Sequence, residues 1–138
     1  MNAYTFVSFD IGTTESFEVV ITADKMEHFL AISGDENPMH MSDEYAKEKG
    51  FESRLVYGML TASMYSTLAG MYLPGENCIL KSVETYFQNP VYIGDVLQVR
   101  GIVKEKDERF QQAKVKAKIV NQNGKTVSKA DILVGFYE

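Results

Sequence analysis

The sequence predicts a single α+β domain in which an antiparallel sheet wraps around a central buried helix. Residues 58–72 contain no charged side chain, and a helix without a charged face is usually buried. From residue 83 onward, apolar and polar residues alternate, which is typical of strands. No repeat or linker divides the 138 residues, so we expect one domain over residues 1–138 with one core. This pattern alone also allows other two-layer α+β sandwiches.

The first part of the chain is predicted to form a strand, a helix and a loop. Glu15–Ile21 favours a strand, and Thr22 is a typical residue for capping the start of a helix. Gly34 suits the end of this helix, and Pro38 prevents its easy continuation. Residues 33–41 are therefore expected to be a loop. The apolar face of the helix consists of Met26, Phe29 and Leu30.

Two more helices are expected before the main sheet. Ser42 can cap a short helix that ends at Gly50. Residues 51–57 then form a connector. The uncharged helix spans Gly58–Tyr72, and the sequence Leu-Pro-Gly at residues 73–75 ends it.

The second half of the chain is predicted to form about four antiparallel strands. Gly101 interrupts the second of these and suggests a bulge. In residues 113–119 small and branched apolar residues alternate strictly with lysines, which indicates one dry and one wet face. Asn123-Gly124 is a strong hairpin signal, and Val127–Phe136 forms the closing strand. The alternating apolar-side positions of the first two strands are Val83, Thr85 and Phe87, then Leu97, Val99 and Val103.

Charge and cysteine content narrow the possible partners and the cell compartment. The formal net charge is −5 and no basic run exceeds two residues, which argues against nucleic acid or an anionic membrane as a partner. A small basic site for a phosphorylated ligand would not be visible in the net charge. The single cysteine, Cys78, cannot form an intramolecular disulfide and indicates a reducing compartment. The first ten residues do not resemble a signal peptide, so we expect a soluble cytoplasmic protein.

One of the two histidines is a candidate for chemistry. His28 lies off the apolar face of its predicted helix and is expected to be solvated. His40 follows Asp35 by five residues in the proline-containing loop, and an acid and an imidazole in one loop can converge on a single water. In the simpler alternative, Asp35 caps a turn over Asn37 and His40 makes one structural hydrogen bond.

The start of the uncharged helix is a second candidate site. Gly58 lets a ligand approach the free N–H groups and the positive dipole end of the helix, which can stabilise an oxyanion. Alternatively, Gly58 only allows a tight turn into the helix. Ser63 and Ser66 lie farther along and lack the context of a nucleophilic serine. Because the chain has two histidines and one cysteine without a metal-binding motif, we predict no metal site.

Four blocks of sequence resemble a known family in their residues and in their order. Residues 33–40 (SGDENPMH) are similar to the signature of the MaoC-like hydratases, the (R)-specific enoyl-thioester hydratase branch of the hot-dog fold. The resemblance covers roughly residues 15–136 and implies a hot-dog fold. The other blocks are LVYGML at 55–60, LPG at 73–75 and FQNPVYIGD at 87–95.

The resemblance implies a reaction and roles for particular residues. Asp35 and His40 would activate a water that adds to trans-2-enoyl-CoA to give (R)-3-hydroxyacyl-CoA, or would catalyse the reverse dehydration. The Gly58 N–H would bind the thioester oxygen. The resemblance implies no cofactor beyond the coenzyme A or acyl carrier protein of the substrate. It also implies a homodimer or a larger even assembly. Supporting positions would be Asn37, Tyr57 and Ser66, and the acyl pocket would include Met59, Leu60 and Ser63.

One departure from the family pattern concerns Tyr57, which stands where the family has a histidine. A phenol still donates a hydrogen bond but does not titrate near neutral pH. Because of this tyrosine, a non-catalytic acyl-thioester binding protein is an alternative to the enzyme. A 3-hydroxyacyl-[acyl carrier protein] dehydratase is a close alternative. A hot-dog thioesterase is a third, although such enzymes typically place an acid on or near the central helix and Gly58–Tyr72 has none.

Overall fold

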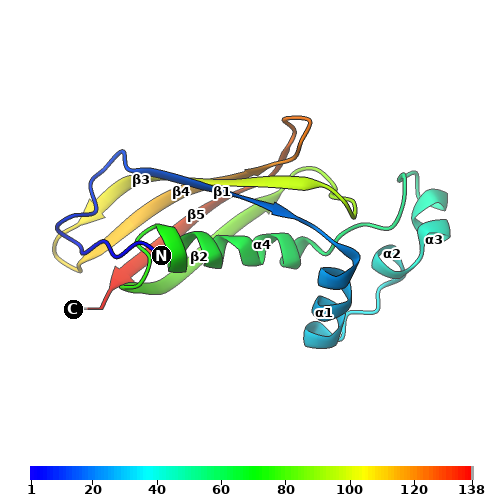
Figure 1. Cartoon of the computed structure of the whole chain (residues 1–138), viewed down its shortest axis with the longest axis horizontal. Coiled ribbons are helices and arrows are strands. Elements are labelled where there is room, and N and C mark those ends of the chain that lie inside the picture. Colours follow the sequence, from blue (N-terminus) through cyan, green and yellow to red (C-terminus); the bar gives the residue numbers. More distant parts are fainter. Residues whose placement is uncertain (138) are drawn as a thin grey trace.

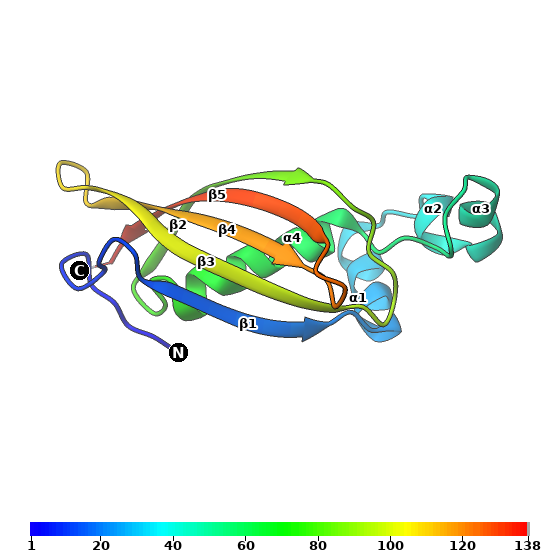
Figure 2. The same cartoon turned by 90° about the horizontal axis from the view of Figure 1, so that it is seen from above.

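The computed structural model describes residues 1–137 and contains one five-stranded antiparallel sheet with the strand order β1-β3-β4-β5-β2. Helix α4 lies along one face of the curved sheet, and α1, α2 and α3 gather beyond one end of it (Figures 1 and 2). The strands are β1 (Thr14–Val20), β2 (Cys78–Phe87), β3 (Val96–Asp107), β4 (Gln112–Val120) and β5 (Thr126–Phe136). The helices are α1 (Ala23–Ser33), α2 (Pro38–Met41), α3 (Asp43–Glu48) and α4 (Gly58–Thr67), which continues into η1 (Leu68–Tyr72).

The predicted boundaries of α1 and the start of α3 are confirmed by their caps. The Thr22 side chain accepts a hydrogen bond from the Lys25 N–H at 3.2 Å. Gly34 ends α1 with φ +69°, and its N–H donates to the Leu30 carbonyl. Such a left-handed residue costs little only when it is glycine. The Ser42 side chain caps α3.

The prediction that residues 33–41 form a loop throughout is wrong, because Pro38–Met41 form the short helix α2. The side chain of Asn37 accepts a hydrogen bond from the Met39 N–H at 2.9 Å. Pro38 occupies the first helical position, where its fixed φ suits a helix and its missing N–H costs nothing. Gly34 therefore ends α1, and the proline begins the next helix instead.

The uncharged helix differs from its prediction in two ways. It is α-helical only from Gly58 to Thr67, and η1 is a π-helical turn in which the Leu73 N–H donates to the Leu68 carbonyl at 2.8 Å. It is also not buried on every side. The sheet covers one side of the helix, and a stripe spaced by four and three residues stays exposed. This stripe consists of Met59, Ser63 and Ser66.

The buried side of α4 is fixed to the sheet by packing and by one polar contact. Tyr65 and Leu68 are fully buried. The hydroxyls of Tyr65 and Ser128 lie 2.7 Å apart, so α4 is joined to β5 by a buried hydrogen bond. A buried hydroxyl needs such a partner to avoid a desolvation cost.

Gly101 is not a bulge, and its prediction as one is wrong. It pairs in regular register with Ala117, whereas the register shift of β3 lies between Val103 and Glu105. A Cβ atom at Gly101 would lie 2.9 Å from side-chain atoms of both Leu68 and Leu73. The glycine therefore allows the end of the central helix to pack closely on the sheet.

The N-terminal segment closes the end of the core that lies far from α1. Phe6 and Phe9 are buried, and their rings lie 5.7 and 5.5 Å from the ring of Phe136. The sequence pattern predicts no helix or strand in this segment. Within residues 1–137, no helix has the length and apolar character needed to cross a membrane.

Candidate active site

A cavity of about 290 Å³ lies where α4 begins. Segments that are distant in sequence contribute to it: the end of α1, the loop after it, α2, the start of α4 and the end of β2. Five residues predicted for the site meet here. The lining residues are Phe29, Ser33, Asp35, His40, Tyr57, Gly58, Met59 and Phe87.

Asp35 lies in the loop between α1 and α2, where its backbone is held by a tight turn. Its Oδ1 accepts a hydrogen bond from the Asn37 N–H at 3.0 Å, and its own N–H donates to the Ser33 hydroxyl at 3.2 Å. Among residues 1–137 no group hydrogen-bonds to Oδ2 of Asp35. One carboxylate oxygen thus orders the turn and the other is available to a ligand.

His40 is oriented by one hydrogen bond to the connector before α4. Its Nδ1 lies 2.8 Å from the backbone oxygen of Leu55. A carbonyl oxygen only accepts, so Nδ1 carries the proton, and Nε2 of the neutral ring is an acceptor. No other group of the described chain bonds to the His40 ring. Both features of the simpler alternative, the turn over Asn37 and the structural hydrogen bond of His40, are therefore present. They leave Oδ2 of Asp35 and Nε2 of His40 without a hydrogen-bond partner in the described chain.

Tyr57 contacts both halves of this acid–histidine pair. Its hydroxyl donates to the backbone oxygen of Asp35 at 2.7 Å, and its ring centroid lies 4.3 Å from that of His40. The side chain is only 2% exposed. Burial, and next the negative charge of Asp35, raise the pKa of Tyr57, so the phenol stays a neutral hydrogen-bond donor at physiological pH.

The start of α4 presents unpaired backbone donors to the cavity. Tyr57 precedes the helix, and its carbonyl accepts from the N–H groups of Leu60 and Thr61. The N–H groups of Gly58 and Met59 find no acceptor within residues 1–137. They coincide with the positive end of the helix dipole, so this part of the cavity suits an oxygen that carries negative charge.

Other residues proposed for the site lie outside the cavity lining. Asn37 caps α2, and Leu60 is buried in the core. Ser63 and Ser66 are exposed on α4, and the Ser63 hydroxyl donates to the Leu60 carbonyl at 2.6 Å. Of the three residues proposed for the acyl pocket, Met59 lines the cavity.

Sequence reasoning did not single out several residues that shape the site. Ser33 and Phe87 line the cavity, and both stand inside the family-like sequence blocks, which could have identified them. Phe29 was predicted only as a core residue. Arg54 donates through Nη1 to the His40 backbone oxygen at 3.4 Å. Within the described residues, no three His, Cys, Asp or Glu side chains are grouped to hold a metal ion.

Comparison with known sequences relates nearly the whole chain to one family. A sequence profile of the MaoC like domain matches residues 6–125. The chain is 34% identical over 100 residues to a 3-hydroxybutyryl-CoA dehydratase of Methylorubrum extorquens, covering 72% of this chain and 64% of that protein. It is 36% identical over 85 residues to a mitochondrial 3-hydroxyacyl-[acyl-carrier-protein] dehydratase of Arabidopsis thaliana, covering 62% of this chain and 49% of that protein. The chain thus spans less than two thirds of the length of these two relatives.

A shorter relative matches over most of both chains, in sequence and in structure. The (R)-specific enoyl-CoA hydratase of Aeromonas caviae is 32% identical over 117 residues, which are 85% of this chain and 87% of that protein. A solved structure of an (R)-hydratase from A. caviae superimposes with a TM-score of 0.89 at 29% identity, covering 94% of this chain and 98% of that one. The predicted hot-dog fold is thereby confirmed.

Proposed function

The chain belongs to the MaoC-like domain family, and from this premise we propose that it adds water to trans-2-enoyl-CoA to form (R)-3-hydroxyacyl-CoA, or catalyses the reverse dehydration. The observation that carries the proposal is that Asp35, His40 and the start of α4 line one cavity. The names of the relatives support the reaction type, since they are hydratases and dehydratases of acyl thioesters.

In the proposed mechanism, Asp35 and His40 hold one water between Oδ2 and Nε2. As the water oxygen bonds to the β-carbon, one of the two groups takes its proton. The electron pair of the carbon–carbon double bond moves toward the thioester, and the α-carbon then takes up the proton that this group removed from the water, which returns the pair to its starting state. The negative charge on the thioester oxygen is stabilised by the free N–H of Gly58, a kind of donor whose removal typically slows reactions about 10²- to 10³-fold.

Three alternatives differ from this proposal in the carrier or in the chemistry. The A. thaliana relative acts on an acyl carrier protein, so the acyl group can instead be delivered on that carrier. The cavity also suits an acyl-thioester binding protein without turnover, or a thioesterase. The central helix has no acid, which favours the hydratase over the thioesterase.

We further propose that the protein works in the cytoplasm, with Cys78 reduced.

We also propose that two copies of the chain pair through β2. β2 is an edge strand whose outer side has no partner among residues 1–137, and open edges are usually covered or protected. Val83 is 37% and Phe87 is 50% exposed, although their alternation predicted one dry face. Pairing would cover them together with the exposed stripe of α4. Light scattering during size exclusion would show twice the chain mass, and a monomer would contradict this assembly.

The first experiment follows the loss of enoyl absorbance when the purified protein meets crotonyl-CoA. Asp35→Asn and His40→Ala should each lower kcat by about 10²- to 10⁴-fold, as removal of a general acid–base group does. Glu36→Gln and His28→Ala are matched controls, because both change exposed side chains outside the cavity lining and should retain full activity.

Different outcomes separate the alternatives. Turnover with crotonyl-[acyl carrier protein] but not with crotonyl-CoA would assign the other carrier. Release of free thiol from a saturated acyl-CoA would identify a thioesterase, and binding without turnover would identify a binding protein. Wild-type activity in folded Asp35→Asn would refute the proposed mechanism, and an (S) product would refute the proposed handedness.

A further inference from the structure

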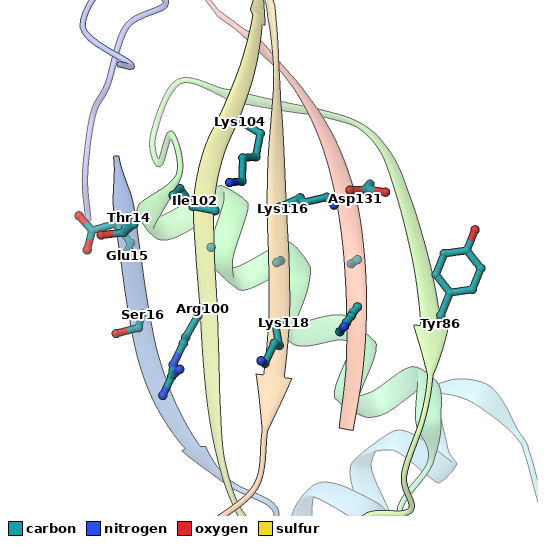
Figure 3. A pocket seen from close by; sticks show the side chains of 14 residues that line it. Thr14, Glu15, Ser16, Tyr86, Arg100, Ile102, Lys104, Lys116, Lys118 and Asp131 are labelled. Atoms are coloured by element: carbon teal, nitrogen blue, oxygen red, sulfur yellow. The ribbon is translucent and has the colours of Figure 1, made fainter. Parts of the chain in front are cut away.

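The sheet carries a second, larger hollow of about 840 Å³ that the proposed reaction does not use. Figure 3 shows it on the side of the sheet opposite α4, which lies behind the strands in this view. Five cationic side chains and two carboxylates line it, although the whole chain has a net charge of −5. The cations are Arg100, Lys104, Lys116, Lys118 and Lys129, and the acids are Glu15 and Asp131.

Three of these cations lie directly opposite one another on neighbouring strands. Arg100 of β3 pairs with Lys118 of β4, and Lys118 pairs with Lys129 of β5. Figure 3 shows Arg100 and Lys118 side by side on this face. Like charges in opposed positions destabilise a sheet. The only ion pair within residues 1–137 joins Lys114 and Glu105, so no carboxylate of the described chain forms an ion pair with this row.

Arg100 and Ser16 offer hydrogen-bond donors to a ligand on this face. The Arg100 guanidinium donates through Nε and Nη2 to the Gln98 side chain, with Nε at 3.0 Å, which leaves Nη1 free. Ser16 and Tyr86 stand at the two ends of the row, opposite Arg100 and Lys129, and the Tyr86 hydroxyl already donates to Oε1 of Glu84 at 2.7 Å. At the side of the hollow stands Asp131, whose carboxylate only accepts hydrogen bonds and is therefore not a partner for phosphate oxygens.

We propose that this row binds a small molecule that carries at least two phosphate groups. Arginine and lysine are the usual partners of phosphate oxygens, and the hollow has the size of a small-molecule site. Three cations on adjacent strands span about 10 Å, which exceeds the width of one phosphate. A long polyanion would also meet the negative charge of the rest of the chain, whereas a small ligand would meet mainly the cations.

The repulsion within the empty row has a measurable consequence. Replacing both Lys118 and Lys129 by alanine removes repulsion and no ion pair. The double variant should therefore unfold at a higher temperature than the wild type in low salt, and lose ligand binding at the same time. A row that is only mutually repulsive would show the same gain in stability but would bind no ligand, so ligand binding is the deciding measurement.

Pyrophosphate is the probe, tested by calorimetric titration and thermal unfolding at constant ionic strength set with sodium chloride. We expect saturable binding and a rise in Tm for the wild type, with affinity at least about tenfold lower in Lys118→Ala/Lys129→Ala. Lys47→Ala/Lys125→Ala removes two exposed lysines elsewhere and should bind like the wild type.

Three results would overturn the proposal. The first is no response to pyrophosphate beyond that to chloride. The second is equal binding by both double variants, which would indicate general charge attraction. The third is binding of inorganic monophosphate as tight as that of pyrophosphate, which would refute the requirement for two phosphates. All readouts are binding or unfolding, so they stay independent of the proposed hydratase activity, and circular dichroism verifies that each variant is folded.

Discussion

The hydroxyl of Tyr57 donates a 2.7 Å hydrogen bond to the backbone oxygen of Asp35, and so connects the residue before α4 to the loop after α1. The same ring packs on the imidazole of His40. Tyr57 therefore contacts both members of the proposed catalytic pair, and we expect it to position them. A histidine at this position, as the family resemblance expects, would have a shorter side chain and a group that titrates near neutral pH.

Tyr57→Phe should loosen the Asp35 loop while keeping the packing on His40. Loss of one hydrogen bond is expected to lower the free energy of unfolding by about 0.5–1.5 kcal/mol. Misplacement of Asp35 and His40 should lower kcat by up to about 10²-fold. KM should change less. Urea unfolding and the crotonyl-CoA assay measure the two effects.

Tyr45→Phe is the control for this change, because Tyr45 lies outside the cavity lining and its hydroxyl makes no hydrogen bond within residues 1–137. An unchanged kcat in Tyr57→Phe would show that the hydroxyl does not position Asp35 for turnover.

Gly58→Ala should impair the site through Phe87. An added Cβ would lie 3.2 Å from the Phe87 ring, which is closer than ordinary van der Waals contact, so the ring or the start of α4 has to shift. A shift of the helix start would misplace the free N–H groups, and we expect kcat to fall by about tenfold or more. The crotonyl-CoA assay measures it.

The pair Gly58→Ala/Phe87→Leu distinguishes a steric effect from a backbone effect. If contact with the ring causes the loss, Gly58→Ala should lower kcat less in the Phe87→Leu background than in the wild type. The effects of the two changes on kcat will then be non-additive. Strict additivity would argue against contact with Phe87 as the cause.

Gly101→Ala should destabilise the fold without changing the cavity at the start of α4. The new methyl group would lie 2.9 Å from Leu68 and Leu73 and 3.1 Å from Val115. Overpacking of this kind costs about 1–3 kcal/mol, measurable by denaturant unfolding. Gly135→Ala is the matched control, because its closest neighbour at 3.0 Å is the flexible end of the Lys81 side chain. Equal costs in both variants would contradict this explanation.

Cys78 should react slowly with alkylating reagents at neutral pH. Burial raises the pKa of its thiol from 9.0 to about 11, and the thiolate is the reactive form. Above pH 9.0 the unfolded thiol gives up its proton while the folded one retains it. This contribution to stability is therefore complete below that pH and is lost as the pH rises toward the folded value.

Iodoacetamide labelling of native and urea-unfolded protein, followed across alkaline pH, tests this prediction. The native rate should remain below the unfolded rate until the pH approaches the raised pKa. Equal rates at neutral pH would show that the thiol is not shielded.

Local patterns allowed several elements to be predicted because they depend on nearby residues. The Thr22 and Gly34 caps and the lysine alternation of β4 are such features. The bulge predicted at Gly101 failed because a glycine in a strand has two explanations, and only the packed helix shows which applies. The exposed stripe of α4 was missed for a similar reason, since the absence of charge does not reveal how far a sheet covers a helix.

The fold class, the acid–histidine loop and the glycine that begins the central helix could be predicted from the sequence, because short motifs and hydrophobic periods are local properties. Tertiary structure alone decided that Asp35, His40 and Gly58 share one cavity with Phe87, and that Tyr57 bonds to Asp35. It also decided that Arg100, Lys118 and Lys129 form one row. These arrangements depend on strand register and helix packing, which bring together residues that are far apart along the chain.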